Sequence, residues 1–282
     1  MRTTDGAHAN PILIGEGLTK VYASTGSGTA REAAVDGIDV SLLPGECLAI
    51  IGESGSGKTT LSRMLLGQLR PDAGQVAYEG RPVLHGSPAA KELARDSALV
   101  FQNPFASLDP RWTIGRSVAE PLLAVRRRGS GHLWHRRQGG TGSADQVAKV
   151  LSEVQLDPGR IMTAYPSDLS GGQAQRAAIA RALVVKPRIL LADEPMSAID
   201  VSARVGILHT LQSIMAQSRK QSNPSNGMSM IIISHDLGVV QHIADRVMVL
   251  SQGKVVEEGP VKAILDHPSQ SYTRQLLAAA TL

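Results

Sequence analysis

The chain carries a glycine-rich segment whose residue types suit phosphate binding. GESGSGKT, from Gly52 to Thr59, fits the pattern G-x-x-x-x-G-K-[ST] without a mismatch. Glycine has no Cβ, so the backbone can wrap closely round a phosphate with its N–H groups pointing inward. We expect Lys58 to reach the β- and γ-phosphates of a nucleotide and Thr59 to ligate Mg²⁺. The residues expected to bind the nucleotide here are Gly52, Glu53, Ser54, Gly55, Ser56, Gly57, Lys58, Thr59 and Thr60.

The flanking residues predict a strand before this segment and a helix after it. The apolar run Cys47–Ile51 has the length and composition of a buried parallel strand. Thr60–Leu66 carries apolar residues at helical spacing and closes at Gly67. An ordinary flexible Gly/Ser loop is the alternative interpretation. The strand, the helix and Lys58 together favour a phosphate loop, because a helix N-terminus adds positive potential beside an anion.

Two acids follow a second apolar run. ILLADE, from Ile189 to Glu194, suits a strand covered on both faces, with Asp193 emerging at its C-terminal end. Open α/β sheets bind their ligands at such ends. Asp193 is therefore the expected Mg²⁺ partner, directly or through water, and Glu194 the expected general base for the attacking water. A strand that ends in acids is also common at a protein surface.

Two further polar side chains follow apolar runs. His235 comes after Met230–Ile233 and could hydrogen-bond the γ-phosphate and the attacking water, although a lone histidine is more often a core or surface residue. Gln102 ends the run Ala98–Phe101 and could sense Mg²⁺ or that water. We therefore expect one polar cluster on one edge of a sheet. Its catalytic members are Glu194, His235 and Gln102, and its metal-binding members are Thr59, Gln102 and Asp193.

A second anion site is expected at LSGGQ, from Leu169 to Gln173. Ser170 is a good N-cap, and the Ala- and Arg-rich residues from Gln173 onward predict a helix. Gly171 and Gly172 leave backbone N–H groups bare at that helix N-terminus. Two chains placed head to tail would hold each ATP between the phosphate loop of one and the residues Ser170, Gly171, Gly172 and Gln173 of the other.

Taken together, these motifs resemble those of the ATP-binding-cassette (ABC) ATPases, over nearly the whole chain. The resemblance implies that Tyr22, in LTKVY, stacks on adenine and that Gln102 links the γ-phosphate to a membrane partner. It also implies that SAID, from Ser197 to Asp200, crosses a dimer interface. Ile199 stands there where the family usually has Leu.

Three longer stretches resemble the dipeptide, oligopeptide and nickel import ATPases: QNPFASLDPR, YPSDLSGGQAQR and HPSQSYTRQLL. Relatives in phosphonate metabolism share these features. Some import members carry a Cys-rich C-terminal extension that binds an iron–sulfur cluster. Because this chain has one cysteine, Cys47, we expect no cluster.

The fold implied by the resemblance is α/β: a P-loop NTPase (RecA-like) core with a helical subdomain and an antiparallel β subdomain. The region without strand patterning lies between the Gln102 strand and LSGGQ, which is the place for the helical subdomain. Its sequence predicts helices at Ile114–Val125 and Ala144–Val154. The expected parts are the core with its β subdomain at 12–102 and 188–259, the helical subdomain at 103–187, a basic insertion at 126–143 and a short helical tail at 260–282.

The basic insertion reads RRRGSGHLWHRRQGGTGS, with five Arg and five Gly. The favoured interpretation is a solvated, flexible insertion. The alternative is an electrostatic contact with anionic lipid headgroups or permease loops. Nucleic acid is a weaker interpretation, because the single Trp134 is a thin platform for stacking bases.

Composition favours a subunit that meets a membrane only through partners. Hydrophobic residues make up 42% of the chain, but no run approaches the 18 apolar residues of a membrane span, and the N-terminus is polar. The resemblance implies two integral-membrane permease subunits, a second ABC ATPase chain (identical or homologous) and, indirectly, an extracytoplasmic solute-binding protein. The expected location is the cytoplasmic face of the plasma membrane. A soluble ABC-type ATPase in phosphonate metabolism or nucleic-acid handling is the alternative, although the modest net charge of +4 does not suggest nucleic acid.

Overall fold

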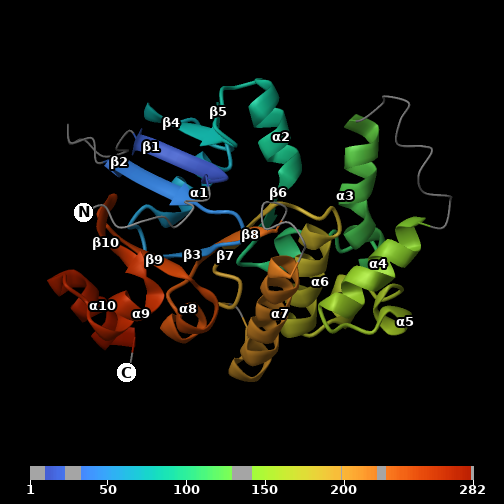
Figure 1. Cartoon of the computed structure of the whole chain (residues 1–282). Helices are drawn as coiled ribbons and strands as arrows, with labels where there is room; N and C mark the ends of the chain where they lie inside the picture. The colour runs from blue at the N-terminus through green and yellow to red at the C-terminus, as the bar shows by residue number, and fades with distance from the viewer. Residues whose placement is uncertain (1–9, 23–32, 129–141, 198, 221–226, 281–282) are drawn as a thin grey trace, which may run out of the picture.

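The computed structural model describes residues 10–22, 33–128, 142–197, 199–220 and 227–280. Within these ranges the chain forms two β-sheets with helices packed against them (Figure 1). The larger sheet has six strands in the order β10-β9-β3-β8-β7-β6, and every neighbouring pair is parallel except β9 with β10. Its strands are β3 (Cys47–Ile51), β6 (Ser97–Val100), β7 (Ile189–Asp193), β8 (Ser229–Ile233), β9 (Arg246–Ser251) and β10 (Lys254–Pro260).

The central strands of this sheet are apolar at almost every position because both faces of the sheet are covered. In β3, Cys47 and Ala49 belong to one buried cluster, whereas Leu48 and Ile50 belong to a second cluster on the opposite face. Each of these four side chains is fully buried. The buried strands predicted from the apolar runs are confirmed, with ends that shift by one residue at β6, β7 and β8.

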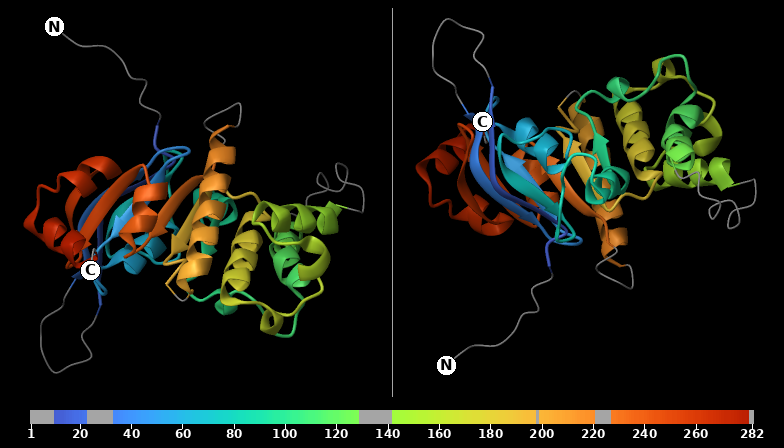
Figure 2. Two further views of the ribbon diagram at one scale, coloured as in Figure 1. Left: turned by 90° about the horizontal axis from the view of Figure 1, so that it is seen from below. Right: turned by 90° about the horizontal axis from the view of Figure 1, so that it is seen from above.

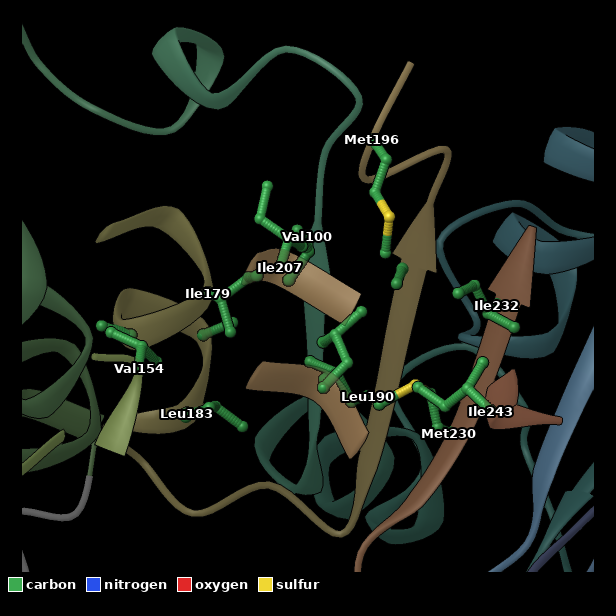
Figure 3. Packing of buried hydrophobic residues seen from close by; sticks show 14 of the residues in the cluster. Val100, Val154, Ile179, Leu183, Leu190, Met196, Ile207, Met230, Ile232 and Ile243 are labelled. Carbon is green, nitrogen blue, oxygen red and sulfur yellow. The ribbon is translucent and has the colours of Figure 1, made fainter. Parts of the chain in front are cut away.

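Helices α6 (Gly171–Leu183), α7 (Val201–Arg219) and α8 (Leu237–Ile243) cover one face of the larger sheet. Figure 3 shows the packing: Leu190 of β7 and Met230 of β8 point toward side chains from the covering helices. Ile207 of α7 and Ile243 of α8 lie among these, and all four are nearly or fully buried. This apolar contact fixes the strands that carry the polar edge residues.

The opposite face is covered by α1 (Lys58–Leu65), by α2 (Pro88–Asp96) and by a four-stranded antiparallel sheet. The predicted antiparallel β subdomain is thus present. Helix α2 was not foreseen, although Ser87 supplies its N-cap by accepting the N–H of Ala90. The strands of the small sheet, in the order β2-β1-β4-β5, are β1 (Leu13–Val21), β2 (Ala33–Leu42), β4 (Ala73–Tyr78) and β5 (Arg81–Pro82).

A group of helices lies between β6 and β7 along the chain. Figure 2 shows it at the end of the molecule away from the small sheet. The two helices predicted at Ile114–Val125 and Ala144–Val154 are present, and α3 runs three residues further than expected, into the basic insertion. Residues 129–141 of that insertion lie outside the described residues. The elements of this region are η1 (Pro104–Ala106), α3 (Ile114–Arg128), α4 (Gly142–Glu153), α5 (Pro158–Ile161), η3 (Pro166–Asp168) and α6.

The predicted helical tail consists of two helices, α9 (Val261–Asp266) and α10 (Ser271–Ala280), which lie beside β10 (Figure 1). Among the helices in the described part of the chain, none is both long and apolar enough to cross a membrane.

Replacement of Ile231 by alanine should test the covered sheet. Ile231 is fully buried in central strand β8, so Ile231→Ala should lower the free energy of unfolding by roughly 3 kcal/mol through lost burial and a residual cavity. Val205→Ala is the control, because Val205 is 56% exposed and its loss should change stability by less than about 0.5 kcal/mol. Chemical denaturation measures both values, and equal effects of the two variants would contradict the packing described here.

Candidate functional site

The parallel strands of the larger sheet end level with one another. Ile50 of β3 pairs with Ile233 of β8, Asp193 of β7 pairs with that same Ile233, and Val100 of β6 pairs with Ala192. Residues that follow these strands therefore emerge at one edge of the sheet. This edge carries the phosphate loop and the predicted polar side chains.

Glu194 lies at the centre of this edge. Its Oε2 accepts a hydrogen bond from the Gln102 amide at 3.3 Å, and its Oε1 lies 3.5 Å from Nδ1 of His235. The His235 side chain is 62% exposed, whereas that of Glu194 is 24% exposed. Two of the side chains predicted to be catalytic, Gln102 and His235, thus meet the carboxylate of the third, Glu194, and each of the three follows a different strand.

The backbone of Glu194 adopts a conformation that few non-glycine residues take. Its φ is 46°, in the left-handed region, so the chain turns away from β7 directly after Asp193. The Glu194 N–H donates to the carbonyl of Ile233 at 2.9 Å, and the Glu194 carbonyl accepts from the N–H and hydroxyl of Ser197 at 3.2 and 3.1 Å. Such strain persists only where surrounding contacts hold it, and here they aim the carboxylate at Gln102 and His235.

Asp193 and Thr59 supply the oxygen atoms expected for a metal ion. The Thr59 hydroxyl donates to Oδ2 of Asp193 at 3.4 Å. Burial and the neighbouring charge of Glu194 raise the pKa of Asp193, against the opposing hydrogen bond from Thr59. A hydroxyl beside a carboxylate is an all-oxygen donor set, which fits Mg²⁺.

Two glycines of the phosphate loop are required by close backbone contacts. A Cβ on Gly52 would lie 2.2 Å from the Leu250 carbonyl oxygen, and one on Gly57 would lie 2.1 Å from that of Ala34. Gly57 also has a φ of 103° and immediately precedes α1. The helix therefore begins at Lys58, two residues before the predicted start, and its N-terminus faces the loop.

The Lys58 ammonium is folded back onto the loop itself. Its Nζ donates to the carbonyls of Gly52 at 2.8 Å and Glu53 at 2.7 Å, and it lies 3.4 Å from the Ser56 hydroxyl. Lys58 is only 7% exposed, and burial lowers its pKa, an effect that the carboxylates of Glu194, Asp193 and Glu53 oppose. The loop thus holds a buried cation by its own backbone.

Tyr22 directly follows β1 and has no hydrogen bond to the strand-edge cluster among the described residues. It directly follows Val21, which pairs with Ala33 at the start of β2. Ala34 follows Ala33 in the chain, and its carbonyl oxygen is the atom that leaves no room for a Cβ on Gly57. Tyr22 is 48% exposed, so its ring is accessible to a ligand.

LSGGQ begins α6 through a reciprocal cap. The Ser170 hydroxyl accepts the Gln173 N–H at 3.3 Å, and the Gln173 side-chain oxygen accepts the Ser170 N–H at 3.0 Å. The predicted N-cap role of Ser170 is confirmed, and the helix begins at Gly171. Within the described residues, no hydrogen bond joins Ser170–Gln173 to the phosphate loop, so the two motifs are separate in one chain.

The two glycines of LSGGQ differ in their surroundings. A Cβ on Gly172 would lie 2.7 Å from Cβ of Ala203, at the start of α7. A Cβ on Gly171 would meet nothing within 4 Å. Gly172 is therefore needed for helix packing, whereas Gly171 faces open space.

The SAID stretch leads into α7. Ile199 is buried at 5% exposure, and Asp200 caps the helix by accepting the Ala203 N–H at 2.8 Å. Ala198, the second residue of the SAID stretch, lies outside the described residues.

One contact was missed from the sequence. The hydroxyl of Tyr272, in tail helix α10, accepts the backbone N–H of Glu53 in the phosphate loop at 3.3 Å. In the sequence, the tail motif HPSQSYTRQLL indicated only a resemblance to the dipeptide, oligopeptide and nickel import ATPases. Nothing in the spacing of residues so far apart along the chain predicts that they meet.

Comparison with known proteins places this site in a family. The ABC transporter family profile matches residues 35–197. The glutathione import ATP-binding protein GsiA of Pectobacterium atrosepticum is 38% identical over 97% of this chain, which spans 42% of that relative's length. The oligopeptide transport ATP-binding protein OppF of Salmonella typhimurium is 38% identical over 88% of this chain, which spans 70% of that relative.

Solved structures of ABC cassettes have a fold similar to that of this chain. A dimeric, post-hydrolysis structure of the ATP-binding cassette MJ0796 with ADP and Pi has a TM-score of 0.71 at 26% identity, covering 88% of this chain and 98% of that one. The cbiO1 structure from Clostridium perfringens has a TM-score of 0.73 at 26% identity and covers 91% of each chain. The chain belongs to the ABC transporter family, and the P-loop NTPase fold expected from its motifs is confirmed.

Proposed function

We propose that this protein is the ATP-hydrolysing subunit of an ABC importer that takes up peptides or a related solute through separate permease subunits. The observation that carries the proposal is the Glu194 carboxylate, held between Gln102 and His235 beside the phosphate loop. The relatives named for oligopeptide transport and glutathione import support both the proposed direction of transport, which is uptake, and the proposed class of solute.

In the proposed reaction Glu194 acts as general base. Its carboxylate accepts a proton from a water molecule whose oxygen forms a bond to the γ-phosphorus of ATP, while the bond from that phosphorus to the β-phosphate oxygen breaks. Gln102 and His235 contact the carboxylate from either side and orient it and the water. The loop N–H groups from Gly52 to Thr60 hold the phosphates, and the exposed ring of Tyr22 stacks on adenine.

Lys58 has to exchange partners when ATP binds. Its ammonium is bonded to the carbonyls of Gly52 and Glu53, and we propose that it turns from at least one of them toward the β- and γ-phosphates. Thr59 and Asp193, with Gln102 nearby, would hold Mg²⁺. When bound, this ion would neutralise charge on the phosphates.

The shared nucleotide requires a second ABC ATPase chain, identical or homologous. We propose that Ser170, Gly171, Gly172 and Gln173 of each chain meet the ATP bound by the other. The separation of these residues from the phosphate loop and the dimeric form of the MJ0796 cassette support this arrangement. The two permease subunits would bind the assembly at the cytoplasmic face of the plasma membrane, and an extracytoplasmic solute-binding protein would deliver the solute.

Removal of the proposed base gives the first functional test. Glu194→Gln keeps the size and hydrogen-bonding capacity of the side chain but cannot accept the proton, so turnover should fall by roughly 10²-fold or more while ATP still binds. Glu153→Gln, on the surface of α4, is the matched control and should leave turnover unchanged. Steady-state phosphate release and equilibrium ATP binding measure the two effects. Near-normal turnover of Glu194→Gln would refute the assignment.

The shared site is tested at Gly171, because substitution of Gly172 would disturb its contact with Ala203 inside the chain. Gly171→Asp places a negative charge where we expect the γ-phosphate of the second chain's ATP. Cooperative hydrolysis should be lost, whereas ATP binding by the single chain and the unfolding temperature should stay near wild type.

Gly171→Ala is the control for added bulk without charge, and it should retain much more activity. If Gly171→Asp abolished ATP binding by the isolated monomer, the shared-site proposal would be wrong.

A further inference from the structure

The tail of the chain is packed onto the nucleotide-binding core. Val261 of α9 and Tyr272 and Leu276 of α10 pack against the same apolar cluster that covers one face of the larger sheet. From this position the Tyr272 hydroxyl accepts the backbone N–H of Glu53 at 3.3 Å. The tail thus reaches the first turn of the phosphate loop.

This hydrogen bond acts on a peptide unit that Lys58 also holds. The N–H of Glu53 and the carbonyl of Gly52 belong to one peptide group and, in a trans peptide, point in opposite directions. Tyr272 binds the N–H side, and the Lys58 ammonium donates to the carbonyl side at 2.8 Å. The orientation of this one peptide therefore decides whether Lys58 keeps the Gly52 carbonyl as one of its two backbone acceptors, the other being the carbonyl of Glu53.

The Gly52–Glu53 peptide needs a contact that fixes its orientation, because glycine allows more backbone rotation than other residues. Gly52 has a φ of 149°, and the nearby Leu250 carbonyl leaves no room for a Cβ. The sequence therefore requires the residue type that restricts backbone rotation least. A bond on the N–H side opposes rotation of the peptide away from Lys58.

Tyr272 is itself held in place by an anchored turn. The Glu257 carboxylate of β10 accepts the N–H and the hydroxyl of Ser269, both at 2.7 Å, and the N–H of Gln270 at 3.3 Å. The Arg274 side chain donates to the carbonyls of Pro268 and Ser269, each at 3.1 Å. The turn that precedes α10 is thus fixed from two directions.

The ionisation of Glu257 agrees with this geometry. Desolvation opposes its negative charge, but the neighbouring Thr273 hydroxyl and the hydrogen bonds from Ser269 and Gln270 lower the pKa of Glu257 to about 2. The carboxylate is therefore charged at neutral pH, and the anchor is in place under the conditions in which the protein would work.

We infer that Tyr272 is a positioning residue for the phosphate loop: through the Gly52–Glu53 peptide it keeps Lys58 preorganised for ATP, and Glu257 holds Tyr272 where it can do so. The inference rests on the proposed function, because it concerns the loop that would bind ATP. Tyr272 acts through the loop backbone, so its loss should weaken ATP binding more than it slows hydrolysis.

The test uses Tyr272→Phe in the full chain, since phenylalanine keeps the packed ring and removes only the hydroxyl. The dissociation constant for ATP, measured by equilibrium titration with a chelator present, should rise about five-fold, the usual effect of one lost hydrogen bond. KM for Mg²⁺·ATP should rise with it, while kcat changes much less. An ATP affinity equal to that of wild type would overturn the inference.

Tyr78→Phe is the matched control. The Tyr78 hydroxyl bonds Asp96, next to the amino-terminal end of β6 and so at the edge of the sheet opposite the phosphate loop. This variant should lower the unfolding temperature without changing ATP affinity. If it weakened ATP binding as much as Tyr272→Phe, the effect would reflect general stability and the inference would be wrong.

The anchor is tested by Glu257→Gln, alone and combined with Tyr272→Phe. Alone it should weaken ATP binding, and it should add little once the Tyr272 hydroxyl is absent, because both changes act on one contact. An equal effect of Glu257→Gln in both backgrounds would overturn the route through Tyr272. A wild-type chain that failed to bind ATP would overturn the proposed function as well, which separates the two failures.

Discussion

The parallel pairing of β6, β7, β8 and β3 is the constraint on which the rest of this structure depends. Parallel strands run in one direction, so their carboxyl ends meet at one edge of the sheet. The level register of Val100, Ala192 and Ile232 brings residues that are far apart in sequence to within hydrogen-bonding distance. Because both faces of the sheet are covered by apolar side chains, polar groups emerge where the strands end, and those of the candidate site emerge at the carboxyl ends.

Charge at this edge is only partly balanced within the chain. Burial and the adjacent Glu194 carboxylate raise the pKa of Asp193, and burial lowers the pKa of Lys58. In the proposed function Mg²⁺ would offset the two acids, and the phosphates would offset Lys58 and the helix N-terminus. Binding would then exchange internal contacts, such as that between Lys58 and the Glu53 carbonyl, for contacts with the nucleotide.

Much of this arrangement could be predicted from the sequence, for physical reasons. A strand covered on both faces needs an apolar residue at nearly every position, so the apolar runs Cys47–Ile51 and Ile189–Ala192 could be identified as buried strands. Parallel strands then require that Asp193, Glu194 and His235 follow at one edge. The catalytic and ligand roles of these residues stay predictions, as do the boundaries of the domains.

What the sequence did not predict depends on contacts between distant segments. Gly171 and Gly172 are equivalent in the motif, and only the approach of Ala203 in α7 separates a packing glycine from an open one. Likewise, the bond from Glu53 to Tyr272 depends on how the tail helices pack, which has no local periodic signal. The observed helix boundaries differ from the predicted ones where a capping residue sets the helix end. Gly57, for example, is the N-cap of α1, so α1 begins earlier than predicted.

The most direct test of this account is a crystal structure of the Glu194→Gln variant grown with Mg²⁺ and ATP. The account predicts two copies placed head to tail, with each ATP bound by Lys58 of one copy and by Ser170 and Gly171 of the other. It also predicts Gln102 and His235 on either side of residue 194, next to the γ-phosphate. A nucleotide contacted by one chain alone, with Ser170 and Gly171 far from any phosphate, would contradict it.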